Sequence, residues 1–117
     1  MANTLLPNQV LGINEYLLST NGAFQLILQS DGNLVEYSSV AYNATATPMW
    51  ISNTAGNPGA YATMQTDGNL VVYSSSNKAL FSTGTFGHAG AVFKIQNDGN
   101  LVIYEPKIPV WASNTAQ

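Results

Sequence analysis

One pattern, Gln-x-Asp-x-Asn-x-Val-x-Tyr, occurs three times, complete each time, in this chain of 117 residues. The copies start at Gln29, Gln65 and Gln96, a spacing typical of repeat architectures. A repeat that serves packing alone keeps its apolar positions, whereas most of the positions fixed here carry hydrogen-bonding side chains. We therefore predict three structural units, each of which carries one copy of a binding site.

The three units share an order of local patterns. Each has an alternating segment, an Asp-Gly-Asn turn in which glycine supplies a positive φ, a second alternating segment and a short aromatic strand. The first segments are 24–29, 61–65 and 92–96, the second are 34–37, 70–73 and 101–104, and the aromatic strands are 49–51, 80–82 and 110–112. Related tails follow at 52–54, 83–85 and 113–115. Residues 16–19 read as one extra strand, with Leu5 and Leu6 as possible additions, and no window favours a helix.

Period-two alternation assigns the strand faces. The predicted core residues are Leu26, Leu28, Leu34, Ala62, Met64, Leu70, Phe93, Ile95 and Leu101, and the predicted outward residues are Ile27, Thr63 and Lys94. Three such hairpin units are expected to close around Trp50, Phe81 and Trp111 as an all-β barrel or prism with pseudo-three-fold symmetry. Glu36 breaks the pattern, because Val72 and Ile103 are apolar at its position, so its surroundings must be open, paired or part of an interface.

Composition narrows the function. The length predicts a single domain, 1–117, and there is no cysteine. Six acidic residues stand against three basic ones, which argues against nucleic-acid binding, and no apolar run is long enough for membrane insertion. The N-terminus has no signal-peptide pattern, which predicts a protein that is cytoplasmic or released without a classical leader. Asp31, Asp67 and Asp98 make up half of the acidic residues and share one repeat position.

The repeated side chains suit a sugar. An ionised Asp accepts hydrogen bonds from neighbouring hydroxyls, Asn and Gln both donate and accept, and Tyr adds a phenolic hydroxyl. Val can lie against ring carbons. Turn chemistry alone explains Asp-Gly-Asn, but it does not explain the Gln and Tyr that lie outside the turn.

The triple motif closely resembles that of the monocot or bulb-type mannose-binding lectins, the snowdrop-lectin-like family. The resemblance covers nearly the whole chain and implies a β-prism II fold of three antiparallel four-stranded sheets with one mannose site per sheet. It assigns the 2-hydroxyl to Asp and Asn, the 3-hydroxyl to Gln, the 4-hydroxyl to Tyr and the ring carbons to Val. The implied binding residues are Gln29, Asp31, Asn33, Val35 and Tyr37; Gln65, Asp67, Asn69, Val71 and Tyr73; and Gln96, Asp98, Asn100, Val102 and Tyr104.

Several features depart from the family. Plant members have a disulfide whose positions correspond to Gly32 and Ala60 here, and Phe81 replaces one of three core tryptophans. The loop 38–48 is longer than its counterparts and lies close to the first site. Relatives also pair by exchange of C-terminal strands, which implies a homodimer or higher homo-oligomer in which residues 108–115 are exchanged.

Other chemistry has little support in the sequence. His88 is the single histidine and has no second ligand nearby, and Asp-Gly-Asn lacks the further carboxylates of a calcium loop, so we expect no metal or other cofactor. Each site has one acid where glycoside hydrolysis needs two, since Glu36 is expected to face the other way, so we expect no catalytic residues and no enzyme. The sequon at Asn43 is expected to be idle. The alternative to a mannose lectin is a lectin-like toxin, antimicrobial or interaction protein whose target is another protein.

Overall fold

The described part of the chain folds into twelve β-strands. The computed structural model describes residues 2–38, 48–105 and 108–116, and none of these residues is helical. The strands are β1 (Thr4–Leu5), β2 (Val10–Leu11), β3 (Tyr16–Leu18), β4 (Phe24–Leu28), β5 (Leu34–Ser38), β6 (Trp50–Ile51), β7 (Tyr61–Met64), β8 (Leu70–Tyr73), β9 (Ala79–Ser82), β10 (Val92–Ile95), β11 (Leu101–Glu105) and β12 (Ile108–Ala112).

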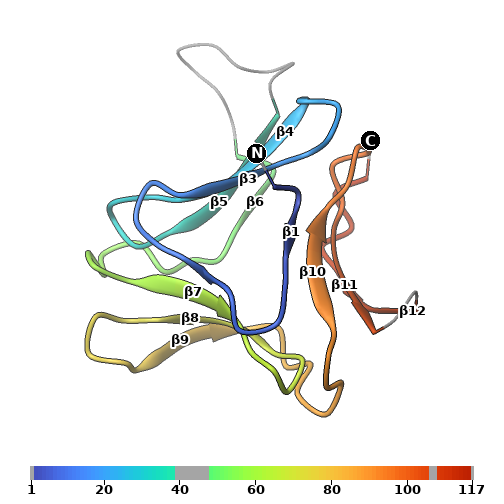
Figure 1. Ribbon diagram of the computed structural model, residues 1–117. Helices are drawn as coiled ribbons and strands as arrows, with labels where there is room; N and C mark the ends of the chain where they lie inside the picture. The colour runs from blue at the N-terminus through green and yellow to red at the C-terminus, as the bar shows by residue number, and fades with distance from the viewer. Residues whose placement is uncertain (1, 39–47, 106–107, 117) are drawn as a thin grey trace.

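These strands form three four-stranded sheets with the orders β3-β4-β5-β6, β2-β7-β8-β9 and β1-β10-β11-β12. Every neighbouring pair is antiparallel. The sheets form the three sides of a prism, and the N-terminal segment runs across all of them (Figure 1). Each side consists of one repeat unit plus one N-terminal strand, so the predicted three-fold arrangement is confirmed.

The N-terminal segment is where the sequence prediction falls short. It supplies three short strands, one to each sheet, and not one strand with an uncertain addition. Leu5, Leu11 and Leu17 recur every six residues and are buried, while Asn8 and Asn14 turn the two corners with φ of 72° and 64°. Strands of two or three residues are too short to show alternation, and this is why the period-two analysis missed β2.

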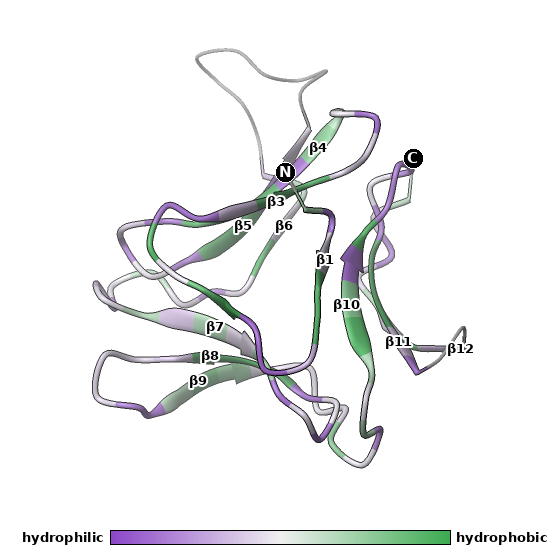
Figure 2. Ribbon diagram, viewed as in Figure 1, coloured by the Kyte–Doolittle hydropathy of each residue, from purple (hydrophilic) through white to green (hydrophobic). Residues whose placement is uncertain are grey.

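The predicted core is confirmed. All nine residues assigned to it are buried, at 1 % exposure or less. Apolar positions lie mainly in the strands and polar positions mainly in the turns, although strands such as β10 also contain polar positions (Figure 2). The ring centroid of Trp50 lies 5.5 Å from that of Phe81 and 6.0 Å from that of Trp111, both edge-on. The third strands of the units thus meet through aromatic contacts, as the sequence predicts.

Glu36 is fully enclosed by the core. In the strand register Glu36 lies opposite Leu26 on β4 and opposite Trp50 on β6, and its side chain has no exposed surface. Thr115 Oγ1 donates a hydrogen bond to Glu36 Oε1 at 3.2 Å, whereas Oε2 has no partner among the described residues. Burial raises the pKa of this carboxyl from 4.5 to about 7; the Thr115 hydrogen bond opposes the rise, and the charge of Asp98 adds to it. Glu36 therefore faces away from the motif surface, as predicted.

Two of the sequence interpretations lie outside the described residues. The sequon at Asn43 falls entirely within 39–47, and so does all of the long loop 38–48 apart from its two end residues.

Candidate functional site

Each motif begins in a hairpin turn that is closed by backbone hydrogen bonds. In the first unit, Gln29 N donates to Asn33 O and Gly32 N donates to Gln29 O, both at 2.9 Å. The same two bonds recur at the second and third turns, at 2.9–3.1 Å. The central glycines Gly32, Gly68 and Gly99 have φ of 91°, 94° and 90°, which L-residues with a side chain rarely adopt. The Gln of each motif therefore lies directly opposite its Asn.

The motif aspartates cap these turns. One carboxylate oxygen of Asp31 accepts a hydrogen bond from the backbone N–H of Asn33 at 2.9 Å. Asp67 and Asp98 make the same bond to Asn69 and Asn100, at 3.0 and 2.9 Å. All three aspartates are exposed. One oxygen of each carboxylate thus stabilises the turn. The second oxygen takes no part in this bond and could accept from a ligand.

The motif asparagines are oriented by the tail that follows each aromatic strand. Asn33 Oδ1 accepts hydrogen bonds from Ser52 Oγ at 3.2 Å and from Thr54 N at 3.1 Å. Asn69 and Asn100 have the same two kinds of partner in their own tails. Since the oxygen accepts from the tail, the donor Nδ2 is left out of these hydrogen bonds.

The tails form a hydroxyl clamp that the sequence analysis noted as a repeat but did not explain. In the second unit, Thr83 Oγ1 lies 2.8 Å from Thr85 Oγ1, which donates to Gly68 O at 2.6 Å. The residue between the two hydroxyls has a positive φ in every unit: Asn53 at 61°, Gly84 at 68° and Asn114 at 61°. The signal that could have identified this clamp is the pattern Ser/Thr-Asn/Gly-Ser/Thr, repeated three times.

Thr85→Val tests the clamp because valine keeps the shape and removes the hydroxyl. We expect the free energy of unfolding to fall by about 1–3 kcal/mol, since the buried carbonyl of Gly68 loses its donor. Thr85→Ser retains the hydroxyl and is the matched control, with an expected loss below about 1 kcal/mol. Urea unfolding of both variants measures the difference; equal losses in the two would show that the hydroxyl has no role.

Gln and Tyr of each motif are joined. Gln29 Nε2 donates to the Tyr37 hydroxyl at 2.6 Å, and the pairs Gln65–Tyr73 and Gln96–Tyr104 make the same contact. The valine between them is almost covered: Val35 is 2 % exposed, and Val71 and Val102 are 3 % exposed. The sequence predicts valine methyl groups that are open to a sugar ring. The structure leaves only a narrow apolar floor accessible at each valine.

These contacts define what each motif can offer a ligand. Asp presents a carboxylate oxygen that only accepts, and Asn Nδ2 only donates. Tyr already accepts from Gln, so its own proton is available, and Gln Oε1 is available as an acceptor. A group that both donates and accepts at adjacent positions, as vicinal hydroxyls do, matches this set. No cation is part of the five-residue motif.

The residues beside each motif differ between the three sheets. Strand register places Ile27 and Ile51 on either side of Val35, and Thr63 and Ser82 on either side of Val71. Lys94 and Ala112 lie on either side of Val102. The first motif thus has apolar neighbours, the second has hydroxyl neighbours, and the third has a lysine.

Each turn also contacts a segment that lies outside its own unit. Asn57 N donates to Asp31 O at 2.9 Å, and His88 N donates to Asp67 O at 3.0 Å. The third turn is held by the N-terminal region, where Thr20 Oγ1 donates to Asn97 Oδ1 at 2.9 Å. A Cβ at Gly32 would lie 2.2 Å from Asn57 O, so the close approach requires glycine.

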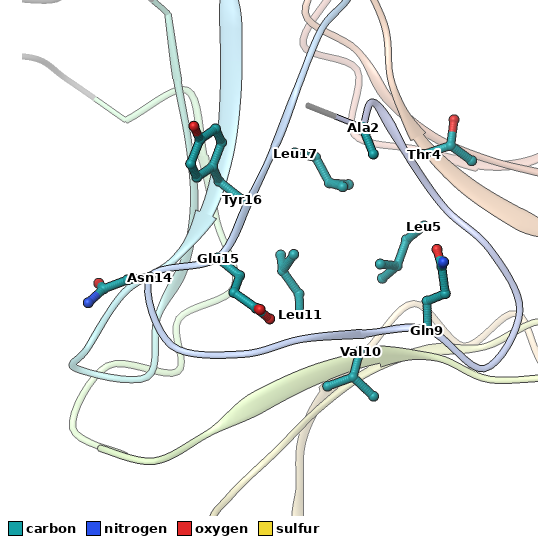
Figure 3. A pocket seen from close by; sticks show the side chains of 10 residues that line it. All are labelled: Ala2, Thr4, Leu5, Gln9, Val10, Leu11, Asn14, Glu15, Tyr16 and Leu17. Carbon is teal, nitrogen blue, oxygen red and sulfur yellow. The ribbon is translucent and has the colours of Figure 1, made fainter.

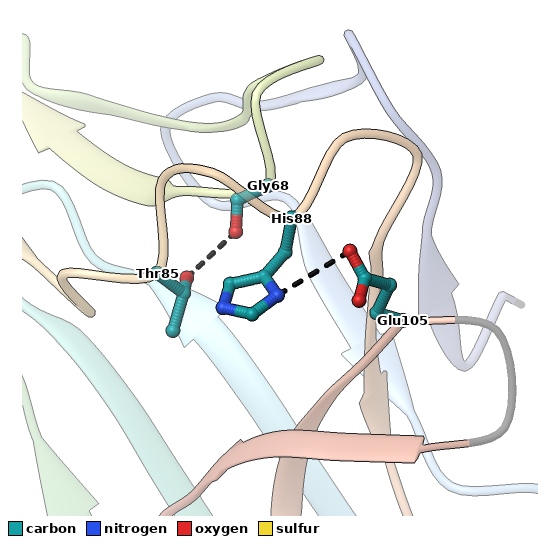
Figure 4. A network of polar contacts seen from close by, with 4 residues as sticks. All are labelled: Gly68, Thr85, His88 and Glu105. Atoms are coloured by element: carbon teal, nitrogen blue, oxygen red, sulfur yellow. Dashed lines mark hydrogen bonds and ion pairs between the residues drawn. The ribbon is translucent and has the colours of Figure 1, made fainter.

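His88 has a structural contact that the sequence analysis did not foresee. Its Nδ1 lies 3.3 Å from Glu105 Oε2, so the loop beneath the second turn contacts the end of β11 (Figure 4). The same figure shows Thr85 bonded to Gly68, which places this contact beside the second clamp. Both side chains are more than a third exposed, so the pair contributes little to stability.

The described residues contain no group of three or more His, Cys, Asp or Glu that could hold a metal ion, and no helix long and apolar enough to cross a membrane. A cavity of about 500 Å³ is lined by residues of the N-terminal segment and by none of the motif residues; Leu5, Leu11 and Leu17 line it together with Gln9 and Glu15 (Figure 3).

Known proteins are similar to this chain in both sequence and architecture. A mannose-specific lectin from Aloe arborescens is 39 % identical over 82 residues, which cover 69 % of this chain and 68 % of the relative. The snowdrop (Galanthus nivalis) mannose-specific agglutinin, solved with methyl-α-D-mannoside, is 38 % identical over 98 % of both chains, with a TM-score of 0.75. The chain belongs to the bulb-type mannose-binding lectin family. No protein-family model matches it.

Further solved structures are similar to this chain in fold and sequence. Monomeric monocot mannose-binding lectins from Gastrodia elata give a TM-score of 0.84 at 32 % identity, over 99 % of this chain and 100 % of theirs. The β-prism II fold implied by the motif is thereby confirmed. One departure also has a structural account: the turn at Gly32, a position of the plant disulfide, is held here by the backbone bond from Asn57 N to Asp31 O.

Proposed function

We propose that this protein is a non-enzymatic lectin that binds mannose and oligomannose glycans through three sites. The observation that carries the proposal is the threefold repetition of one polar geometry: a capping Asp, an Asn turned by its clamp and a joined Gln–Tyr pair. Membership of the bulb-type lectin family supports the choice of sugar.

The binding roles follow from the donor and acceptor pattern. One sugar hydroxyl donates to the outer oxygen of Asp and accepts from Asn Nδ2. A second and a third hydroxyl meet Gln and Tyr, and the ring lies over the narrow Val floor. An axial 2-hydroxyl separates mannose from glucose, so we assign the selectivity to Asp and Asn. These roles apply to all fifteen motif residues, five in each sheet.

Competition between sugars tests this function. Binding of the protein to immobilised mannan is expected to be inhibited by methyl α-mannoside, and at least about tenfold less well by methyl α-glucoside, because an equatorial 2-hydroxyl leaves Asp and Asn unmatched. Methyl α-galactoside is the negative control. Equal inhibition by all three sugars, or by none, would reject a mannose site.

We also propose that the protein acts as a homo-oligomer formed by exchange of the C-terminal strand. Strand β12 pairs with β11 of its own chain. Each unit ends in a third strand, and β12 is the third strand of the last unit in the described chain. Exchange would therefore replace these bonds with the same bonds to a partner. Light scattering gives the mass in solution, and a monomer at all concentrations would remove this part of the proposal.

A further inference from the structure

The third motif differs from the other two by one charged neighbour. Lys94 lies on β10 directly opposite Val102, at the position that Ile27 and Thr63 occupy beside the first and second motifs. A lysine ammonium has three donors, no acceptor and a full positive charge. The charge beside the motif therefore differs between the third sheet and the other two.

A cavity adjoins this lysine and the third motif. It has a volume of about 420 Å³, and Lys94, Gln96 and Asp98 line it together with Asn3 and Thr20. Cavities of this size are typical of small-molecule sites. It extends the third motif toward the N-terminal segment, because Asn3 O accepts from Ile95 N at 2.9 Å and Thr20 bonds Asn97.

No carboxylate of the described residues lies within 4 Å of the Lys94 ammonium. Among the described residues the one ion pair within 4 Å is that of His88 with Glu105, so Asp98 shares the cavity with Lys94 but does not pair with it. The third site therefore holds one carboxylate and one ammonium. The first and second motifs each present a carboxylate with no cation on the neighbouring strand position, and both would repel an anionic ligand.

We infer that the third site accepts mannosides that carry an anionic substituent of the phosphomonoester type, with Lys94 as the residue that holds the anion. This inference rests on the proposed function and names the ligand class of one of its sites. Asp98, Asn100, Gln96 and Tyr104 bind the sugar hydroxyls, and the substituent lies in the cavity against the ammonium. The hydrogen bond is charge-assisted and fades with added salt.

Single-site proteins test the inference. Asp→Asn at two of the three positions 31, 67 and 98 leaves one site, and affinities are measured for methyl α-mannoside, mannose 6-phosphate and mannose 1-phosphate. The third site is expected to bind at least one phosphate ester about threefold more tightly, relative to methyl α-mannoside, than the second site does. The preference is expected to vanish in 0.5 M salt.

A residue swap supplies the matched control. Lys94→Thr installs the residue of the second sheet and is expected to abolish the preference while binding of methyl α-mannoside stays unchanged. Thr63→Lys in the protein that retains the second site is expected to raise its relative affinity for the esters. Inorganic phosphate is expected not to displace mannose 6-phosphate at equal concentration.

The outcomes separate the two proposals. If methyl α-mannoside binds all single-site proteins but the esters show no preference for the third site, the inference is overturned and the lectin function stands. The same follows if Lys94→Thr keeps the preference, or if inorganic phosphate displaces the ester. If no mannoside binds any single-site protein or the wild type, the proposed function itself fails.

Discussion

Replacing Glu36 with isoleucine is expected to raise the free energy of unfolding at pH 8 by roughly 2–3 kcal/mol. The carboxyl is enclosed, one of its oxygens has no described partner, and its pKa is raised from 4.5 to about 7 mainly by burial. Isoleucine is the residue of the third unit at this position, Ile103, which is likewise buried. The variant thus restores an apolar core position in the sheet where the repeat is broken.

The pH dependence of the wild type follows from the same residue. Because the pKa in the folded state, about 7, lies above the ordinary 4.5, the folded protein keeps a proton that the unfolded chain has released between these values. The contribution to stability is fully present below pH 4.5 and is lost as the pH rises to 7. Above pH 7 both states are ionised and the loss is complete.

Urea unfolding at pH 5, 6, 7 and 8 measures both effects. Glu36→Ile is expected to be stabilised most at pH 8 and to lose the slope between pH 5 and pH 7. Glu36→Gln keeps the shape without the charge and is expected to lose the slope as well. A wild-type stability that rises steadily from pH 5 to pH 7 would contradict the protonated, buried state of Glu36.

Replacing Asp31, Asp67 and Asp98 together with asparagine is expected to abolish mannose binding while the fold is retained. An asparagine oxygen can still cap each turn by accepting from the next motif residue's backbone N–H. Its second atom is a donor where the sugar hydroxyl needs an acceptor, and it lies beside Nδ2 of the motif asparagine. Each site is expected to lose about 2–3 kcal/mol, or roughly 30- to 150-fold in affinity.

Binding to immobilised mannan, together with a thermal melt, checks this prediction. The triple variant is expected to show no retention, because the loss at each site also removes the gain from multivalency. Its melting temperature is expected to stay within about 5 °C of the wild type. Retention equal to that of the wild type would mean that the aspartates are turn caps and nothing more.

The repeat made most of the fold predictable. Met64, Phe93 and Leu101 are buried where alternation places them, and the Asp-Gly-Asn turns have the positive φ that glycine was expected to supply. The short strand Val10–Leu11 was not predictable, because two residues show no period and its pairing with β7 depends on the closed prism. The state of Glu36 was left open for a similar reason: only the packed sheets decide whether a carboxyl at that position is enclosed.

The residues proposed for the site come from the sequence, whereas their geometry could not be predicted from it. The motif names Asn69 and Gln65, but the sequence gives no indication that Asn69 Oδ1 is held by Thr83 and Thr85, or that Gln65 is bonded to Tyr73. Those contacts depend on tails and strands that meet only in three dimensions. The near-complete burial of Val71 depends on the same packing, and it removes most of the apolar surface that alternation suggested.

The number of mannose sites per chain tests the central claim most directly. Amide signals of Asn33, Asn69 and Asn100 Nδ2 can be followed separately by nuclear magnetic resonance while methyl α-mannoside is added. Since the proposed function has each Nδ2 donate to a sugar hydroxyl, all three signals are expected to shift and to saturate at three sugars per chain. Saturation at fewer than three sugars per chain, or any of the three signals left unmoved at concentrations where the protein binds mannan, would contradict binding at all three sites.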